Sequence, residues 1–350
     1  MRSGKKTSRT IICALCGLMA LAVRAPGPPA GAQGNQAIRV RVDVVSLPVV
    51  VTDRGGKRIL DLKKEDFEVY EDGVLQEISG FGATDEPVTI ALALDTSGST
   101  ETQLARIQNE AIRFVNLLHP DDSVAVLSFA DDVSLLEDFS IDRDRNAYGI
   151  KETRPGGWTI LYEAVWLCLE EVLKPIQERT ALVLFTDGVD TRSRHASRKD
   201  TVELAKESRA TVYCVYFNTE RDPRTPIGIG TPRVPGSPVP GWPPVQTTPL
   251  PPVQTGASRI EYMEGRAYLH ELAEYTGGRV LDVLQMHDLA PAFEEIAREL
   301  ASQYSIGYQS KNDKRDGKFR KVQVKVKQPD LVARTKKGYY APKEDTSKKK

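Results

Sequence analysis

Three short polar segments of the sequence carry side chains that could bind a metal ion. Asp95, Ser97 and Ser99 lie in the first segment, Thr159 lies in the second, and Asp187 lies in the third. These five residues offer carboxylate and hydroxyl oxygens, and such a set selects a hard cation. Mg²⁺ is the default ion, and Mn²⁺ or Ca²⁺ also accepts oxygen ligands. Because the hydroxyls are neutral, the ion would keep excess positive charge and favour one more anionic oxygen, such as a partner's carboxylate.

The elements around these segments would place them at one edge of a sheet. The first segment follows the apolar run Val88–Leu94, which reads as a strand buried on both faces. The third follows a similar run, Ala181–Phe185, and the second leads into a helical pattern over Leu161–Leu173. Loops at the carboxyl ends of neighbouring strands converge in doubly wound sheets. If the two strands are neighbours, two carboxylates and three hydroxyls meet in one crevice.

Strands and helices alternate over residues 86–304, which predicts an α/β domain with a doubly wound, mostly parallel sheet. Ser123–Phe129 and Val133–Phe139 read as a hairpin, and Thr211–Phe217 as another buried strand. Further helices are expected near residues 104–118, 201–208, 265–275 and 289–302, with Thr100 and Gln103 forming a capping box before the first.

A proline-rich stretch interrupts this alternation. Residues 221–258 hold eleven of the chain's 22 prolines, so this stretch cannot join the sheet and is predicted to be an extended loop insertion. It could be a recognition arm of polyproline character or an insertion tolerated at a surface turn.

The two flanks of the central domain both read as β structure. Residues 37–85 and 305–342 show period-two alternation and turn signals such as Glu71-Asp72-Gly73. Isolated hairpins are marginal in water, so the N-terminal and C-terminal β segments are expected to pair with each other into a small β-sandwich. The central domain would then be an insertion between them, and residues 343–350 a charged tail.

The first 32 residues have the pattern of an export signal. Basic residues precede the apolar run Ile11–Val23, and Ala30-Gly31-Ala32 offers a cleavage point. No later stretch is long and apolar enough to cross a bilayer, so we expect a periplasmic or secreted protein. Cys168 and Cys214 would remain; such a compartment permits a disulfide between them, although two buried free thiols are the favoured reading.

Several classes of function are disfavoured by the sequence. Lys+Arg and Asp+Glu balance at 48 each, so no net charge attracts nucleic acid. The four histidines lack zinc spacing, and there is neither a P-loop nor a Gly-x-Ser-x-Gly elbow. Asp131-Asp132 and Asp142 to Asp144 read as solvated turns rather than a second cation site. We therefore expect a protein that is not an enzyme.

Together, the three segments resemble the metal-ion-dependent adhesion site, or MIDAS, of von Willebrand factor A domains. The resemblance comprises Asp95-x-Ser97-x-Ser99, Thr159 within Gly-Gly-x-Thr-x-Leu-Tyr-Glu-Ala, and Thr186-Asp187-Gly188. The flanks, including Gly338-Tyr339-Tyr340, look like a bacterial exported family related to these domains. The resemblance implies that the hydroxyls contact the metal and that Asp95 and Asp187 contribute directly or through water. Trp158 departs from the pattern, and it could form part of the ligand face or cover the helix start.

The expected function is an exported, metal-dependent binding module for adhesion or assembly, which docks an Asp or Glu of a protein partner. One alternative is a structural metal site, with ligand binding by the β segments. The other is a metal-assisted hydrolase, for which no free acid or base is evident beside Asp95 and Asp187. The sequence does not identify the partner.

Overall fold

The computed structural model describes residues 44–83, 86–219 and 257–343, all within one compact unit, Val42–Lys350. The predicted signal peptide, nearly all of the proline-rich stretch and the tail from residue 344 lie outside the described residues. Across the ranges that are described, no helix combines the length and the apolar character needed to cross a lipid bilayer.

A six-stranded sheet forms the centre of the fold, with the order β10-β9-β8-β5-β6-β7. Its strands are β5 (Val88–Asp95), β6 (Ser123–Phe129), β7 (Val133–Ser140), β8 (Arg179–Thr186), β9 (Thr211–Phe217) and β10 (Val280–Val283). All neighbours pair in parallel except β6 and β7, which form an antiparallel pair. The prediction of a doubly wound, mostly parallel sheet is confirmed.

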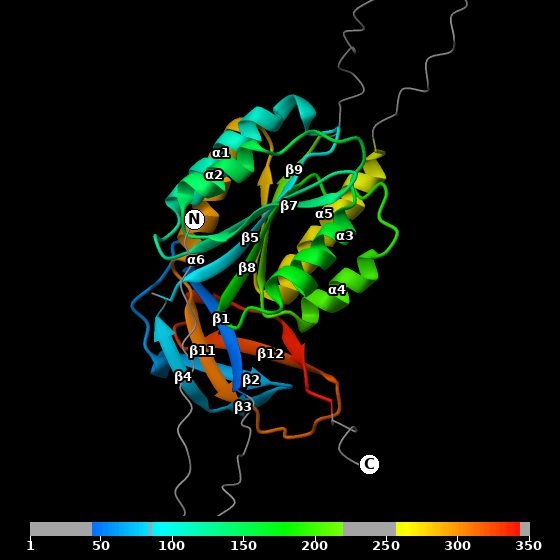
Figure 1. The fold of residues 1–350 in the computed structure, drawn as a ribbon. Helices are drawn as coiled ribbons and strands as arrows, with labels where there is room; N and C mark the ends of the chain where they lie inside the picture. The colour runs from blue at the N-terminus through cyan, green and yellow to red at the C-terminus, as the bar shows by residue number, and fades with distance from the viewer. Residues whose placement is uncertain (1–43, 84–85, 220–256, 344–350) are drawn as a thin grey trace, which may run out of the picture. The chain divides into compact units, whose positions relative to one another are not determined.

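Helices cover both faces of this sheet (Figure 1). They are α1 (Leu104–Leu117), α2 (Arg143–Lys151), α3 (Leu161–Leu167, continued by a π-helical turn, Cys168–Leu173), α4 (Arg198–Glu207), α5 (Arg259–Thr276) and α6 (Leu289–Leu300). Side chains of β5 alternate between the two layers, so Leu92 packs with α1 and α6 while Ala93 packs with α3 and α5. Phe114 and Phe293 join α1 to α6, with ring centroids 5.2 Å apart. Cys168 and Cys214 are buried free thiols in the other layer, so the disulfide alternative is excluded.

Two details of the helices differ from the sequence-based expectations. The predicted capping box is wrong, because the Thr100 hydroxyl donates to the carbonyls of Asp95 (3.1 Å) and Ser97 (2.9 Å), and a 3₁₀ turn, Glu101–Gln103, precedes α1. Helix α2 was not predicted, because its sequence is mostly polar and shows no apolar stripe. Asp142, read as part of a solvated turn, caps α2 instead by accepting from the Asp144 amide at 3.0 Å.

The flanking strands form two antiparallel four-stranded sheets, which we call the β module. One has the order β13-β1-β11-β4 and the other β14-β12-β2-β3. The strands are β1 (Val44–Asp53), β2 (Phe67–Glu71), β3 (Val74–Gln76), β4 (Ile78–Ala83), β11 (Tyr304–Gln309), β12 (Phe319–Val326), β13 (Leu331–Arg334) and β14 (Gly338–Tyr340). Short 3₁₀ turns occur at Lys64–Asp66 and Met286–Asp288. Because β1 pairs with β11 and β2 with β12, the predicted association of the two terminal segments is confirmed.

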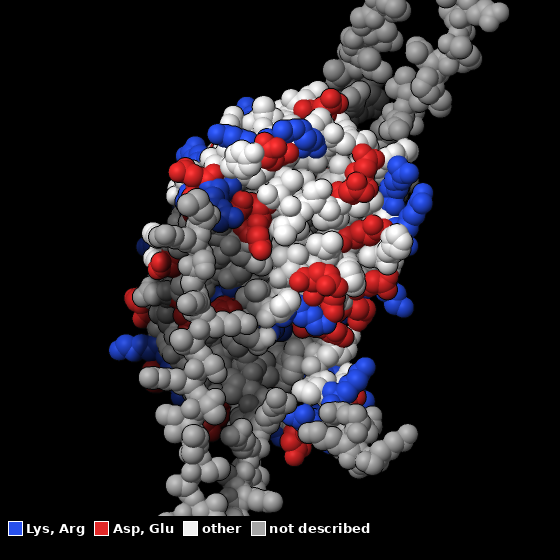
Figure 2. Space-filling view, in the orientation of Figure 1, with Lys and Arg blue, Asp and Glu red and all other residues white. Residues whose placement is uncertain are grey.

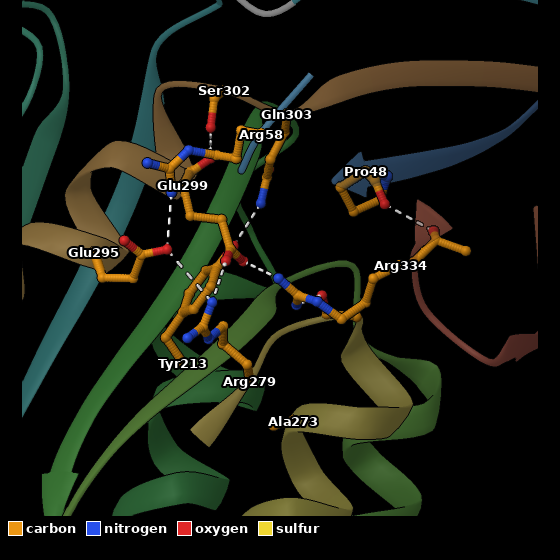
Figure 3. A network of polar contacts seen from close by, with 12 residues as sticks. Pro48, Arg58, Tyr213, Ala273, Arg279, Glu295, Glu299, Ser302, Gln303 and Arg334 are labelled. Carbon is orange, nitrogen blue, oxygen red and sulfur yellow. Dashed lines mark hydrogen bonds and ion pairs between the residues drawn. The ribbon is translucent and has the colours of Figure 1, made fainter. Parts of the chain in front are cut away.

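A network of charges around the buried Glu299 joins α6 to the β module (Figure 3). Glu299 of α6 is only 2% exposed and pairs with Arg334 of β13, while Arg279 lies 3.5 Å from its other oxygen. Nearby, Arg58 of the N-terminal β segment donates to Glu295 at 2.9 Å. These contacts tie the last helix of the central domain to β13 and to the segment that follows β1.

Candidate metal centre

The first and third predicted segments lie side by side because β5 and β8 are neighbours. The two strands pair in parallel up to Leu94 and Phe185, so Asp95 and Thr186 follow at the same edge of the sheet. The Thr186 hydroxyl donates to Asp95 Oδ2 at 2.7 Å. The strand neighbourhood on which the site prediction depended is therefore present.

A chain of hydrogen bonds connects four of the five predicted ligands. The Ser97 hydroxyl donates to Asp95 Oδ1 at 2.6 Å and lies 3.1 Å from the Ser99 hydroxyl. Ser99 in turn donates to Asp187 Oδ2 at 2.9 Å. Two hydroxyls thus bridge carboxylates that come from the ends of different strands.

Thr159 lies beside this chain but is not joined to it. Its carbonyl accepts from the amides of Thr191 (2.9 Å) and Arg192 (3.0 Å), and its amide donates to the Thr191 hydroxyl at 2.8 Å. The second segment contacts the first through the Gly156 amide and the Thr96 carbonyl, 2.8 Å apart. Within the described part of the chain, we find no hydrogen bond from the Thr159 hydroxyl to the other four residues.

Both carboxylates of the site are buried. Asp95 is fully enclosed, and burial, together with the nearby charge of Asp187, raises the pKa of Asp95 to about 7, although hydrogen bonds from Ser97 and Thr186 oppose the shift. Burial also raises the pKa of Asp187, which is 2% exposed. Among the described residues, neither carboxylate has an ion pair with a Lys, Arg or His side chain. Two like charges therefore share a buried site without a cation from the chain.

The chemistry of this donor set fits a hard divalent cation. Every donor is an oxygen, and a cation between two carboxylates would offset both their repulsion and part of their desolvation. No cluster of three or more His, Cys, Asp or Glu suited to a metal occurs in the described ranges, so hydroxyls would have to complete the ligand set. That requirement suits Mg²⁺ better than the nitrogen- and sulfur-preferring metals.

Asp187 has further partners that the sequence did not reveal. The Thr219 hydroxyl donates to Asp187 Oδ2 at 2.6 Å and lies 3.0 Å from the Tyr262 hydroxyl of α5. Helix α5 is close because Gly188, at φ 80°, lies directly against Gly265; a Cβ atom on Gly265 would be 2.3 Å from the Gly188 carbonyl oxygen. No local motif links residues this far apart in sequence, so only the fold could identify them.

Comparison with known proteins supports the identity of the central fold. Residues 90–189, just under a third of the chain, match the von Willebrand factor type A domain family. The matched segment begins within β5 and ends just after β8, and so contains all three predicted ligand segments. This segment of the chain is thus similar to that family. A comparison with curated proteins gives no match.

Solved structures with similar folds include a von Willebrand factor type A protein from Catenulispora acidiphila, at 12% identity over 87% of this chain and 75% of that one, with a TM-score of 0.45. The domain of the type V pili tip protein Mfa5 from Porphyromonas gingivalis is 19% identical over 34% and 44%, with a TM-score of 0.30. Proximal thread matrix protein 1 from the mussel byssus, solved with a zinc-occupied MIDAS motif, is 17% identical over 64% and 49%, with a TM-score of 0.42.

The matches span about half the length, or less, of the pilus tip and byssus proteins.

Proposed function

We propose that the chain is an exported binding protein whose central domain holds a divalent cation, Mg²⁺ by its oxygen chemistry, and docks an Asp or Glu side chain of a protein partner. One observation carries this proposal: Asp95 and Asp187 are buried together, bridged only by hydroxyls, with no cationic side chain paired to either in the described ranges. Export rests on the pattern of the first 32 residues alone.

The residues that would hold the ion are Asp95, Ser97, Ser99 and Asp187, with Thr159 from the neighbouring loop as a fifth. Bound there, a divalent ion supplies a positive charge that can accept one more carboxylate. Asp95 and Ser97 are buried, whereas Gly98 and Ser99 are exposed, so the Ser99 side is open to a partner. This open side favours docking over a purely structural ion, which would be enclosed by the chain's own ligands.

Partner capture by the full chain, with and without Mg²⁺, tests the proposal. We expect capture to require Mg²⁺, to be reversed by a chelator, and to be lost in Asp95→Ala. Glu71→Gln is the matched control, because Glu71 is also a buried carboxylate held by hydroxyls but lies in the β module. Capture that survives both the chelator and Asp95→Ala would disprove metal-dependent docking. Loss of capture in Glu71→Gln alone would instead favour ligand binding by the β module.

A further inference from the structure

An exposed tryptophan lies on the loop that contacts the first predicted ligand segment, because a Cβ atom on Gly98 would be 3.4 Å from the carbonyl oxygen of Gly157. Trp158 precedes Thr159, and its side chain remains 38% exposed although large aromatic side chains are usually covered. Its backbone is held in place, because Asp131 accepts from the amides of Gly157 (2.7 Å) and Trp158 (3.3 Å). The indole therefore stands on a fixed loop at the rim of the site, and this position favours the ligand-face reading of Trp158.

Arg192 lies over this tryptophan. Its guanidinium carbon is 5.2 Å from the centre of the Trp158 ring, a cation–π distance, and its amide donates to the Thr159 carbonyl at 3.0 Å. Its side chain is 44% exposed, and its nearest acidic group, Asp131, is 3.9 Å away. In the described part of the chain, no hydrogen bond from this guanidinium is found. Apart from this long ion pair with Asp131, its paired N–H groups are available to bind a carboxylate.

The second half of the loop that carries Arg192, just before α4, is basic. Thr191–Arg198 contains three arginines and one histidine but no Asp or Glu, although the whole chain has a net charge of zero. Figure 2 shows Lys and Arg side chains gathered at the right-hand edge of the molecule, over the loop that leads into α4. Arg198 is paired with Glu271 and His195 lies 3.3 Å from Glu163, so Arg192 and Arg194 carry the positive charge that this loop offers to an acidic partner.

From this arrangement we infer that Trp158 and Arg192 form a second contact point, which binds a second carboxylate next to the one taken by the ion. The inference rests on the proposed function and narrows the partner to a protein segment with two adjacent acidic residues. Trp158 orients the guanidinium from beneath, and Arg192 presents its N–H groups to the second acid.

Two synthetic peptides provide the probe, one with a single Asp between glycines and one with two consecutive Asp residues. Binding to the full chain is measured by calorimetry with saturating Mg²⁺, and the ratio of the two affinities is compared between variants. We expect Arg192→Gln to lower the two-acid affinity by about three- to fivefold, the scale of an exposed ion pair, without changing the one-acid affinity. Its Mg²⁺ affinity should match that of the wild type, which shows that the site is folded.

Arg194→Gln is the matched control, because Arg194 is an exposed arginine in the same loop. An unchanged ratio in Arg192→Gln overturns the inference, and so does an equal loss in Arg194→Gln, which would reveal only the general charge of the loop. ¹⁹F NMR of protein containing 5-fluorotryptophan gives a second readout. The two-acid peptide should shift the Trp158 signal, assigned with Trp158→Phe, but not the signal of the equally exposed Trp166, assigned with Trp166→Phe.

The outcomes separate this inference from the proposed function. Mg²⁺-dependent binding of the one-acid peptide, without any added effect of Arg192, overturns the second contact alone. If neither peptide binds in a Mg²⁺-dependent way, both the docking function and the second contact are overturned.

Discussion

Two regions of the protein bury carboxylates, and they differ in what accompanies the charge. At the junction with the β module, Glu299 is enclosed but pairs with Arg334 and has Arg279 within 3.5 Å (Figure 3). At the carboxyl edge of the central sheet, Asp95 and Asp187 have only hydroxyl and amide donors. A buried charge that the chain neutralises itself serves the structure, whereas two that it leaves unneutralised are what the proposed binding of an external cation would require.

Glu71 of the β module sharpens this comparison. It is also buried and accepts from three hydroxyls, those of Tyr308 (2.8 Å), Tyr339 (2.9 Å) and Ser310 (2.6 Å). Hydroxyl donors alone are therefore not diagnostic of a metal site. What distinguishes the candidate metal centre is that two carboxylates are joined through linked hydroxyls, so that their mutual repulsion remains.

The largest effect on stability is expected from removing the positively charged side chain of Arg334 at the junction with the β module. Arg334→Leu leaves Glu299 buried without its main partner and should lower the free energy of unfolding by about 3 kcal/mol. Urea unfolding measures this loss. The stabilisation by Mg²⁺ should be the same as in the wild type, because the junction lies away from the metal centre. A smaller Mg²⁺ effect in this variant would show that the two regions are coupled and would break the comparison.

The next largest effect concerns Mg²⁺ itself. If the ion binds only the folded protein, Mg²⁺ at 100 times its dissociation constant adds about 2.7 kcal/mol to the free energy of unfolding. Asp95→Asn should abolish this gain while raising the stability of the metal-free protein, because it removes one of two repelling charges. Thermal unfolding with Mg²⁺ and with a chelator tests both effects. An undiminished Mg²⁺ effect in Asp95→Asn would contradict the assignment.

A pH dependence follows from the raised pKa of Asp95. Its value in the folded protein, about 7, lies above the ordinary value of 3.8, so folding favours the protonated form. In metal-free protein this group should therefore lower the free energy of unfolding as pH rises from 3.8 to about 7, with no further change above that range. The free energy of unfolding in urea is measured for the wild type and for Asp95→Asn across this pH range. The difference between the two gives the slope with pH that depends on Asp95. If this difference in the free energy of unfolding stays constant or rises with pH, the buried charge is already neutralised.

The smallest Mg²⁺-linked effect is expected at Glu71. Glu71→Gln weakens the hydrogen bonds from three hydroxyls and should cost about 1–2 kcal/mol. That loss should be the same with Mg²⁺ and with a chelator, because no second carboxylate shares the site. Parallel urea titrations would detect any unequal loss, which would remove the distinction between one buried carboxylate and two.

Local patterns in the sequence predicted the parts of the fold that they encode. The apolar runs Val88–Leu94 and Ala181–Phe185 identified the two strands whose ends carry the site, and the doubly wound topology placed them together. The two terminal β segments were expected to pair because neither could be stable alone, and β1 does pair with β11. The first prediction depends on apolar runs, and the second on the need of each β segment for a partner. Both can be read from the sequence.

Other features depend on distances that no local pattern contains. Helix α2 was missed because its polar sequence lacks an apolar stripe, and the Thr100 hydroxyl was assigned to a capping box although it bonds to carbonyls of its own loop. Thr219 contacts Asp187 because it follows β9, the strand next to β8 in the sheet. Whether Thr159 is a ligand remains a prediction, because its hydroxyl contacts none of the other four.

The attachment of the central domain has a mechanical consequence. Strand β5 begins at Val88, soon after β4 of the β module, and ends at Asp95 of the candidate metal centre. The β module and this centre therefore lie at opposite ends of β5 (Figure 1). The chain enters through β4 and leaves through β11, and these two strands pair antiparallel, with Ala83 opposite Tyr304. A force applied at the candidate metal centre would therefore act on β4 and β11 at the same end. The hydrogen bonds between β11 and β1 would then be loaded together, in shear, instead of breaking one at a time.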